Sequence, residues 1–137
     1  VTYINGEAEE LLPEKKEAFD VVTCLEAIEH VPDPQKLVQT CSDLCKPGGT
    51  IVFSTINRNP KSFLFAIIGA EYILNLLPKG THEFKKFIKP SELSNMMRNS
   101  DLEVKEIIGM SYNPLTKKYW LGKDVDVNYL IHAEKLK

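Results

Sequence analysis

The stretch that decides the fold class is FDVVTCLEAIEHVPDPQKLVQTCSDLCKPGGTIVFSTI, residues 19–56. It opens with a continuous apolar run, FDVVTC (19–24), which is typical of a parallel strand buried on both faces. Asp33 and Pro34 then provide an N-cap and a first helical residue, and apolar residues follow at helical spacing. Two glycines end this helix, and TIVFSTI (50–56) is typical of a second apolar strand. This strand–helix–strand unit predicts an α/β fold with right-handed crossovers.

Patterns on either side predict further elements of one domain. VTYI (1–4) is β-branched and aromatic, as in a short strand, and the turn residues Asn5 and Gly6 follow it. SYNPLTKKYWLGKDVDV (111–127) is turn-rich. We expect a helix and two more strands in KPSELSNMMRNS (89–100), LEVKEIIGM (102–110) and NYLIHAEK (128–135).

The composition is that of a globular protein. The chain has 137 residues, of which 43% are hydrophobic and 26% charged, enough for one domain with a sizeable core. A net charge of -2 argues against a general nucleic-acid binder. The three cysteines form no CxxC pair, which favours buried apolar roles over metal or redox chemistry.

The first apolar strand is followed directly by CLEAIEH (24–30), which carries Glu26, Glu29 and His30. At positions i, i+3 and i+4, one helical turn would place these three side chains on one face. Two carboxylates and an imidazole could bind a divalent metal, and the imidazole could instead be a general base. The same trio is also typical of an ordinary polar helix start, so the residue types leave three interpretations open.

The sequence resembles the second half of a class I S-adenosylmethionine-dependent methyltransferase. The resemblance lies in the order of three segments: an acidic turn, then FDVVTCLEAIEHVPDP, then LCKPGGTIVFST. Three motifs, NRN (57–59), PKGTH (78–82) and YNP (112–114), are more specific and resemble the O-methyltransferases of ubiquinone biosynthesis. The resemblance covers nearly the whole chain. It implies methylation of polyprenylated catechols, namely 3-demethylubiquinol and the earlier 3,4-dihydroxy polyprenyl intermediate.

For the fold, the resemblance implies a Rossmann-like, seven-stranded, mostly parallel sheet. The family's glycine-rich cofactor loop and ribose-binding acidic residue, on its first two strands, have no counterpart in this sequence. We therefore interpret residues 1–137 as the C-terminal part of a single methyltransferase domain, in which VTYI is the third strand. FDVVTC would then have an unpaired, aggregation-prone edge. We also expect residues 1–137 alone to bind cofactor poorly.

The resemblance also implies roles for individual residues. Contacts to the S-adenosyl-L-methionine cofactor would come from a turn and from the end of a strand, at Gly6, Glu7, Ala8 and Leu25. Glu26, Glu29 and His30 would bind Mg²⁺, which would chelate the catechol and lower a hydroxyl pKa that is about 10 for a phenol. The alternative is that His30 removes this proton as a lone general base.

SFLFAIIGAEYILNLL (62–77) is apolar but only 16 residues long, whereas a membrane span needs about 20. A core helix, a lid helix and a helix in the bilayer interface remain as interpretations. Its aromatics and flanking lysines favour membrane-surface contact through about residues 61–89, within an insertion at about 58–89. We expect a bacterial cytoplasmic protein that is peripheral to the inner membrane and takes part in a ubiquinone-biosynthesis complex, with the matrix side of the mitochondrial inner membrane as the alternative location. A non-catalytic membrane or assembly module, or a methyltransferase for another small acceptor, is the competing hypothesis.

Overall fold

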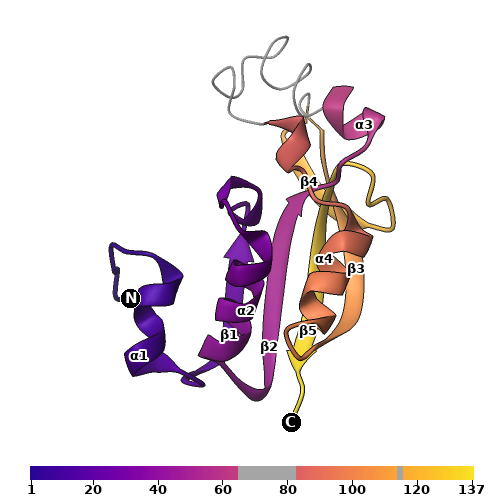
Figure 1. Ribbon diagram of the computed structural model, residues 1–137. Coiled ribbons are helices and arrows are strands. Elements are labelled where there is room, and N and C mark those ends of the chain that lie inside the picture. The colour runs from indigo at the N-terminus through magenta and orange to yellow at the C-terminus, as the bar shows by residue number, and fades with distance from the viewer. Residues whose placement is uncertain (65–82, 114–115) are drawn as a thin grey trace.

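The predicted strand–helix–strand unit is present in the computed structural model, which describes residues 1–64, 83–113 and 116–137 (Figure 1). Strand β1 (Phe19–Leu25) pairs in parallel with β2 (Cys45–Ile56), and helix α2 (Pro34–Leu44) connects them. The Asp33 carboxylate caps α2 by accepting a 3.0 Å hydrogen bond from the Lys36 amide. The predicted N-cap and helix start are therefore confirmed.

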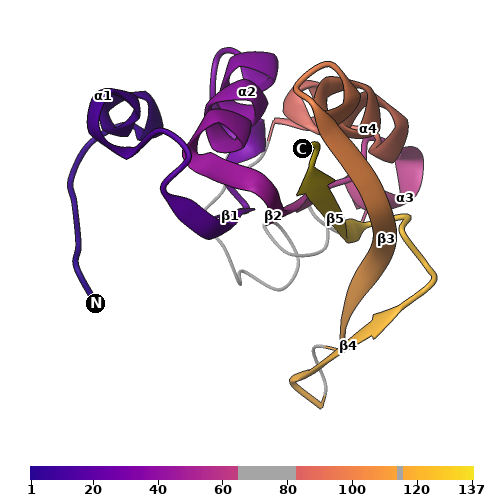
Figure 2. The same cartoon turned by 90° about the horizontal axis from the view of Figure 1, so that it is seen from below.

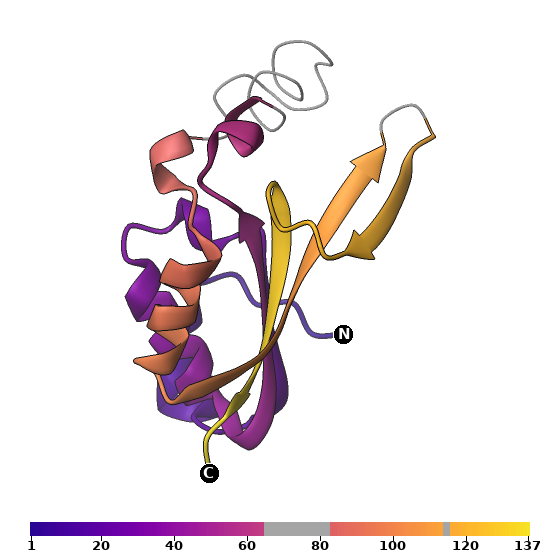
Figure 3. The same ribbon diagram turned by 90° about the vertical axis from the view of Figure 1, so that its right-hand side faces the viewer.

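The sheet has five strands among the described residues, in the order β1-β2-β5-β3-β4. Strands β3 (Leu102–Asn113) and β5 (Asn128–Lys135) confirm two predicted strands, and β2–β5, β5–β3 and β3–β4 are antiparallel. Strand β4 (Lys118–Gly122) lies where only turns were expected, and it forms with β3 a hairpin that projects from the sheet (Figure 3). Tyr112 and Tyr119 face each other across it with ring centroids 4.5 Å apart, a pairing that no local pattern revealed.

Helices α2 and α4 (Pro90–Arg98) cover one face of the sheet, and the core lies between them and the strands (Figure 2). Ile51 and Phe53 of β2 and Tyr129 of β5 are fully buried there. Helix α4 confirms the helix predicted after Lys89. The remaining described helices are short: η1 (Ala8–Leu11), α1 (Leu12–Lys15), η2 (Ile28–His30), α3 (Pro60–Ser62) and η4 (Phe84–Lys86).

Two predictions for the N-terminal half are wrong. Residues 1–4 form no strand, and Val1, Tyr3 and Ile4 are exposed, because no described strand lies beside them to accept their backbone hydrogen bonds. Strand β1 is not buried on both faces: it is an edge strand whose Val21 side chain is 58% exposed. The unpaired edge of β1 is confirmed within the described part of the sheet.

The NRN motif fixes the chain after β2. The Asn57 side chain donates to the Val125 carbonyl at 2.9 Å, and the Asn59 side chain donates to the Asp126 carbonyl. Arg58 forms an ion pair with Glu92 of α4. These contacts give the motif a structural role, because they tie the end of β2 to the β4–β5 connection and to a covering helix.

The apolar segment 62–77 lies mostly outside the described residues, as does the whole PKGTH motif with His82. Among the helices that the structure describes, none is both long and apolar enough to cross a bilayer.

We expect Gly109→Ala to destabilise the full-length protein by about 1–3 kcal/mol in thermal or denaturant unfolding. Gly109 is buried in β3, and a Cβ there would lie 1.7 Å from the Asp124 carbonyl oxygen, so the backbone of the β4–β5 connection would have to move. Gly122→Ala is the matched control, because its Cβ would meet only a Trp120 ring atom at 4.0 Å, and its effect should stay within about 0.5 kcal/mol. Equal effects of the two substitutions would contradict this packing constraint.

Candidate functional site

The polar residues that follow β1 and β2 come together at one edge of the sheet. Because the two strands are parallel, their carboxyl ends point the same way, and ligands of open α/β sheets bind beyond such ends. Leu25 at the end of β1 is paired with Ser54 near the end of β2. The segment Glu26–His30 therefore lies against the last residues of β2.

The predicted trio does not occupy one face of a helix. Glu26 precedes η2 and has a left-handed backbone with φ 51°, so it is outside the helical turn. Glu29 is buried, with 3% of its surface exposed, whereas His30 is exposed. The expectation of three side chains side by side on a helical turn is therefore wrong, because the turn is a single 3₁₀ turn that begins only at Ile28.

Glu26 is bound to Ser54 through both its backbone and its side chain. Its amide donates to the Ser54 carbonyl and to the Ser54 hydroxyl oxygen, each at 3.1 Å. The Ser54 hydroxyl in turn donates to the Glu26 carboxylate at 2.7 Å. The first residue of the turn is thus held by three hydrogen bonds to one residue of β2.

Glu29 is bound to the next residue of β2. The fully buried Thr55 hydroxyl donates to Glu29 Oε2 at 2.8 Å. The other carboxylate oxygen, Oε1, is buried and has no hydrogen-bond partner among the described residues. Desolvation by burial raises the pKa of the Tyr129 phenol, and the negative charges of Glu92 and Glu29 raise this pKa further.

The two carboxylates are drawn apart because Ser54 and Thr55 are consecutive strand residues, whose side chains point to opposite faces of a sheet. Thr55 shares the helix-covered face with Ile51 and Phe53, so Ser54 lies on the other face. No three His, Cys, Asp or Glu side chains of the described residues are arranged to hold a metal ion. The placement of Glu26, Glu29 and His30 therefore does not fit the predicted three-residue Mg²⁺ site.

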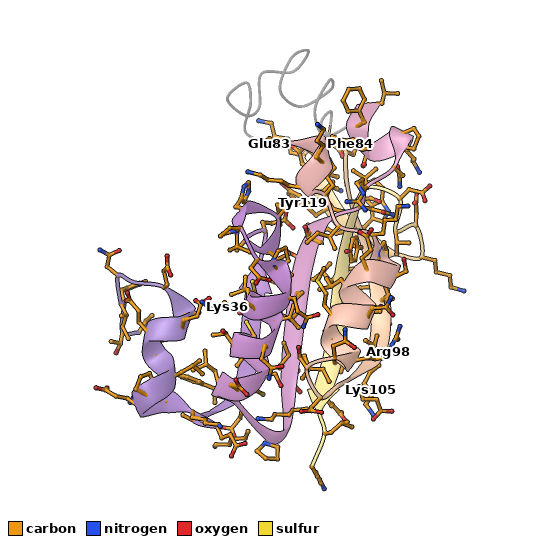
Figure 4. All side chains as sticks on the ribbon, viewed as in Figure 1. Lys36, Glu83, Phe84, Arg98, Lys105 and Tyr119 are labelled. Carbon is orange, nitrogen blue, oxygen red and sulfur yellow. The ribbon has the colours of Figure 1, made fainter. Side chains whose placement is uncertain are left out.

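A groove of about 970 Å³ lies along the free edge of β1, between this strand, α2 and the N-terminal segment. Its lining includes three of the four residues predicted to contact cofactor, namely Glu7, Ala8 and Leu25. Gly6, the fourth, lines a smaller neighbouring hollow together with Glu7 and Ala8. Lys36 extends from α2 toward the N-terminal segment, where its ammonium lies 3.9 Å from the Glu9 carboxylate (Figure 4). The structure brings these residues together, and their contact with cofactor stays a prediction.

Cys24 of β1 and Cys41 of α2 face each other in the wall of this groove. A hydrogen bond from the Cys41 thiol lowers the pKa of Cys24, and the same contact together with burial raises the pKa of Cys41. Cys41 and Cys45 are buried and Cys24 is half-buried, as expected for cysteines in apolar roles, and all three are free.

The sequence alone did not single out Ser54 and Thr55. The available signal was a pair of hydroxyl residues at the carboxyl end of an otherwise apolar strand, IVFST. A strand at this position needs no hydroxyls for its backbone pairing, so their presence could have indicated side-chain partners in the neighbouring turn.

The chain is similar to methyltransferases in sequence. A family model described as a methyltransferase domain matches residues 3–107. A protein of Marinobacter nauticus named ubiquinone biosynthesis O-methyltransferase is 63% identical over 135 residues, covering 97% of this chain and 57% of that protein. A Pseudomonas syringae pv. tomato protein of the same name is 63% identical over 133 residues, with the same coverage. The chain thus spans less than two thirds of the length of these relatives.

Solved structures of methyltransferases have a similar fold. A SAM-dependent methyltransferase of Thermotoga maritima, described as a possible histamine N-methyltransferase, superposes with a TM-score of 0.67 at 25% identity, covering 95% of this chain and 62% of that one. A SAM-dependent methyltransferase of Aquifex aeolicus superposes with a TM-score of 0.62 at 7% identity, covering 98% and 55%. At 7% identity, the similarity to the Aquifex aeolicus protein is a similarity of fold alone.

Proposed function

Because this chain belongs to the methyltransferase domain family, we propose that it is part of an S-adenosylmethionine-dependent O-methyltransferase of ubiquinone biosynthesis. The family match and the fold of the solved relatives confirm the predicted class I methyltransferase fold. The observation that carries the proposal is the position of the groove: it borders the carboxyl end of β1, where α/β folds bind ligands, and has Ala8 and Leu25 in its wall.

The relatives' name supports a reaction within ubiquinone biosynthesis, and we propose a polyprenylated catechol, 3-demethylubiquinol or its 3,4-dihydroxy precursor, as the acceptor. We also propose that residues beyond this chain complete the cofactor pocket in the full-length protein, on strands that pair with the free edge of β1 and fill the groove except at the carboxyl end of β1, where Ala8 and Leu25 would contact cofactor. Under this proposal, calorimetry finds weaker S-adenosylmethionine binding to residues 1–137 than to the full-length protein. Equal affinities would contradict it.

Residues of the groove suit the cofactor chemically, since Ala8 and the half-exposed Leu25 offer apolar surface to an adenine ring. When bound, S-adenosylmethionine supplies an electrophilic methyl group. The chain has to align the acceptor oxygen and to remove its proton, since orientation accounts for much of the rate of such a displacement. In our proposal His30, exposed at the end of η2, takes the proton of the catechol hydroxyl at an imidazole nitrogen.

The family resemblance implied magnesium binding by Glu26, Glu29 and His30, but their placement does not support it, and the proposed proton transfer does not depend on a metal. Glu26 and His30 are both exposed, but the Glu26 carboxylate accepts a hydrogen bond from Ser54, so His30 is the residue of the trio that we assign as general base.

We expect His30→Asn in the full-length protein to lower kcat for catechol methylation by about 10²–10⁴-fold, because it removes the general base. Calorimetry should find unchanged S-adenosylmethionine affinity. Glu26→Gln is the companion variant: under the general-base proposal it leaves the Mg²⁺ concentration needed for half-maximal activity unchanged. A raised Mg²⁺ requirement would instead favour the metal-binding trio, and full activity of His30→Asn would exclude the proposed base.

We expect Leu25→Asp to raise the dissociation constant for S-adenosylmethionine about tenfold or more, since a charge replaces apolar contact surface worth about 1.5–3 kcal/mol. Leu25 is 54% exposed, so the substitution should leave the melting temperature nearly unchanged. Leu121→Asp, at a 59% exposed leucine of β4, is the matched control and should bind cofactor normally. An unaltered affinity of Leu25→Asp would place the cofactor elsewhere.

We further propose that the full-length protein contacts a membrane surface through residues around 61–89, on the cytoplasmic face of a bacterial inner membrane, where a polyprenyl acceptor resides. Support among the described residues comes from Phe63 and Leu64, which are 42% and 52% exposed, beside the basic residues Lys85 and Lys86 of η4. Phe63 packs edge-on against Phe84 of η4, with ring centroids 5.4 Å apart, so this apolar surface adjoins those lysines.

We expect Phe63→Asp combined with Leu64→Asp to reduce flotation of the full-length protein with anionic liposomes, because it removes apolar contact surface and adds charge repulsion. Leu136→Asp is the control, since Leu136 is 51% exposed and the C-terminus lies at the opposite end of the molecule from α3 (Figure 1). If the double variant floats like the parent, the membrane does not contact this surface.

A further inference from the structure

We propose that Ser54 and Thr55 are positioning residues that hold the Glu26–His30 turn from both faces of the sheet and thereby fix the direction of His30. The inference rests on the proposed function, because it deepens the role of the same site. In this assignment Glu26 and Glu29 serve as anchors of the turn, and the hydroxyl–carboxylate pairs Ser54–Glu26 and Thr55–Glu29 form what we call the double clamp.

The Ser54–Glu26 pair of the double clamp stabilises a strained backbone at Glu26. A non-glycine residue at φ 51° is uncommon, and such conformations persist only where surrounding contacts enforce them. At Glu26 these contacts are its amide, which donates to Ser54 at two oxygens, and its carboxylate, which accepts from the Ser54 hydroxyl. A glycine at position 26 would adopt this φ without strain, but it would have no carboxylate. We therefore assign the Glu26 side chain to the contact with the Ser54 hydroxyl.

The Thr55–Glu29 pair acts inside the core. Thr55 is fully buried and Glu29 is 3% exposed, and burying a hydroxyl and a carboxylate is costly unless they bond to each other. Valine would match threonine in shape and suit a buried strand at least as well, so packing alone does not require a hydroxyl at position 55. Its one hydrogen bond goes to Glu29, whose other oxygen lacks a partner, which makes Thr55 the main restraint on this carboxylate among the described residues.

Together the two pairs bracket the turn immediately before His30. Glu26 is fixed on the face away from α2 and α4, Glu29 is fixed on the helix-covered face, and Ile28 between them is fully buried in the core. The His30 amide donates to the Ala27 carbonyl at 3.0 Å, so the backbone of His30 is bonded to the bracketed segment. The contacts to β2 therefore restrain the backbone from which the His30 side chain projects.

The first test is independent of activity. Hydrogen–deuterium exchange of the full-length protein should show faster exchange of residues 26–30 in Ser54→Ala and in Thr55→Val, by about tenfold, because each variant loses a hydrogen bond to a charged group. Ser54→Thr and Thr55→Ser retain the hydroxyls and should restore protection. Thr50→Val, in the middle of β2 and four residues before Ser54, is the matched control and should leave the exchange of this turn unchanged.

The second test measures catechol methylation by the same variants. Ser54→Ala and Thr55→Val should lower kcat about 10- to 100-fold with little change in the KM for S-adenosylmethionine, and the conservative variants should recover most of it. If residues 26–30 exchange no faster in Ser54→Ala and in Thr55→Val than in the parent, the double clamp is wrong. If these residues exchange faster but kcat is unchanged, the double clamp exists but does not position His30. A parent protein that methylates no catechol refutes the proposed function instead, while the exchange result still decides the clamp.

Discussion

The alternation of side chains along β2 is the constraint on which the candidate site depends. This strand is parallel to β1 on one side and antiparallel to β5 on the other, so its position is fixed by two backbone ladders. Its odd-numbered residues Ile51, Phe53 and Thr55 face the helices, and Ser54 faces the other side. A turn that crosses the end of this strand meets one hydroxyl on each face, and its two carboxylates separate accordingly.

The free edge of β1 forms one wall of the groove, which is the other part of the candidate site besides the Glu26–His30 turn. Val21 and Leu25 are more than half exposed along an edge that pairs with no described strand, and the groove follows this edge. An apolar edge of this kind is unfavourable for a protein in water and is normally covered or paired. The groove and the trio thus lie at neighbouring positions around the end of one strand.

Much of the fold could be predicted because the signals were local. Asp33 and Pro34 set the start of α2, and the runs TIVFSTI, LEVKEIIGM and NYLIHAEK predicted β2, β3 and β5. The predictions that were wrong concern the pairing between strands. Residues 1–4 have strand composition but no described partner strand, β1 lies at an edge, and β4 is stabilised by pairing with β3 across a hairpin. Pairing partners are not encoded in the residues of a single strand.

The sequence by itself determined the class of the fold, the resemblance to methyltransferases, and the concentration of Glu26, Glu29 and His30 directly after a strand. The tertiary structure decided what these residues contact. Helical spacing predicted one shared face, but the left-handed residue Glu26 and the register of β1 on β2 direct the two carboxylates to Ser54 and Thr55. The physical reason is that a side chain's partners across 26 to 28 positions of sequence depend on strand register, which only the assembled sheet defines.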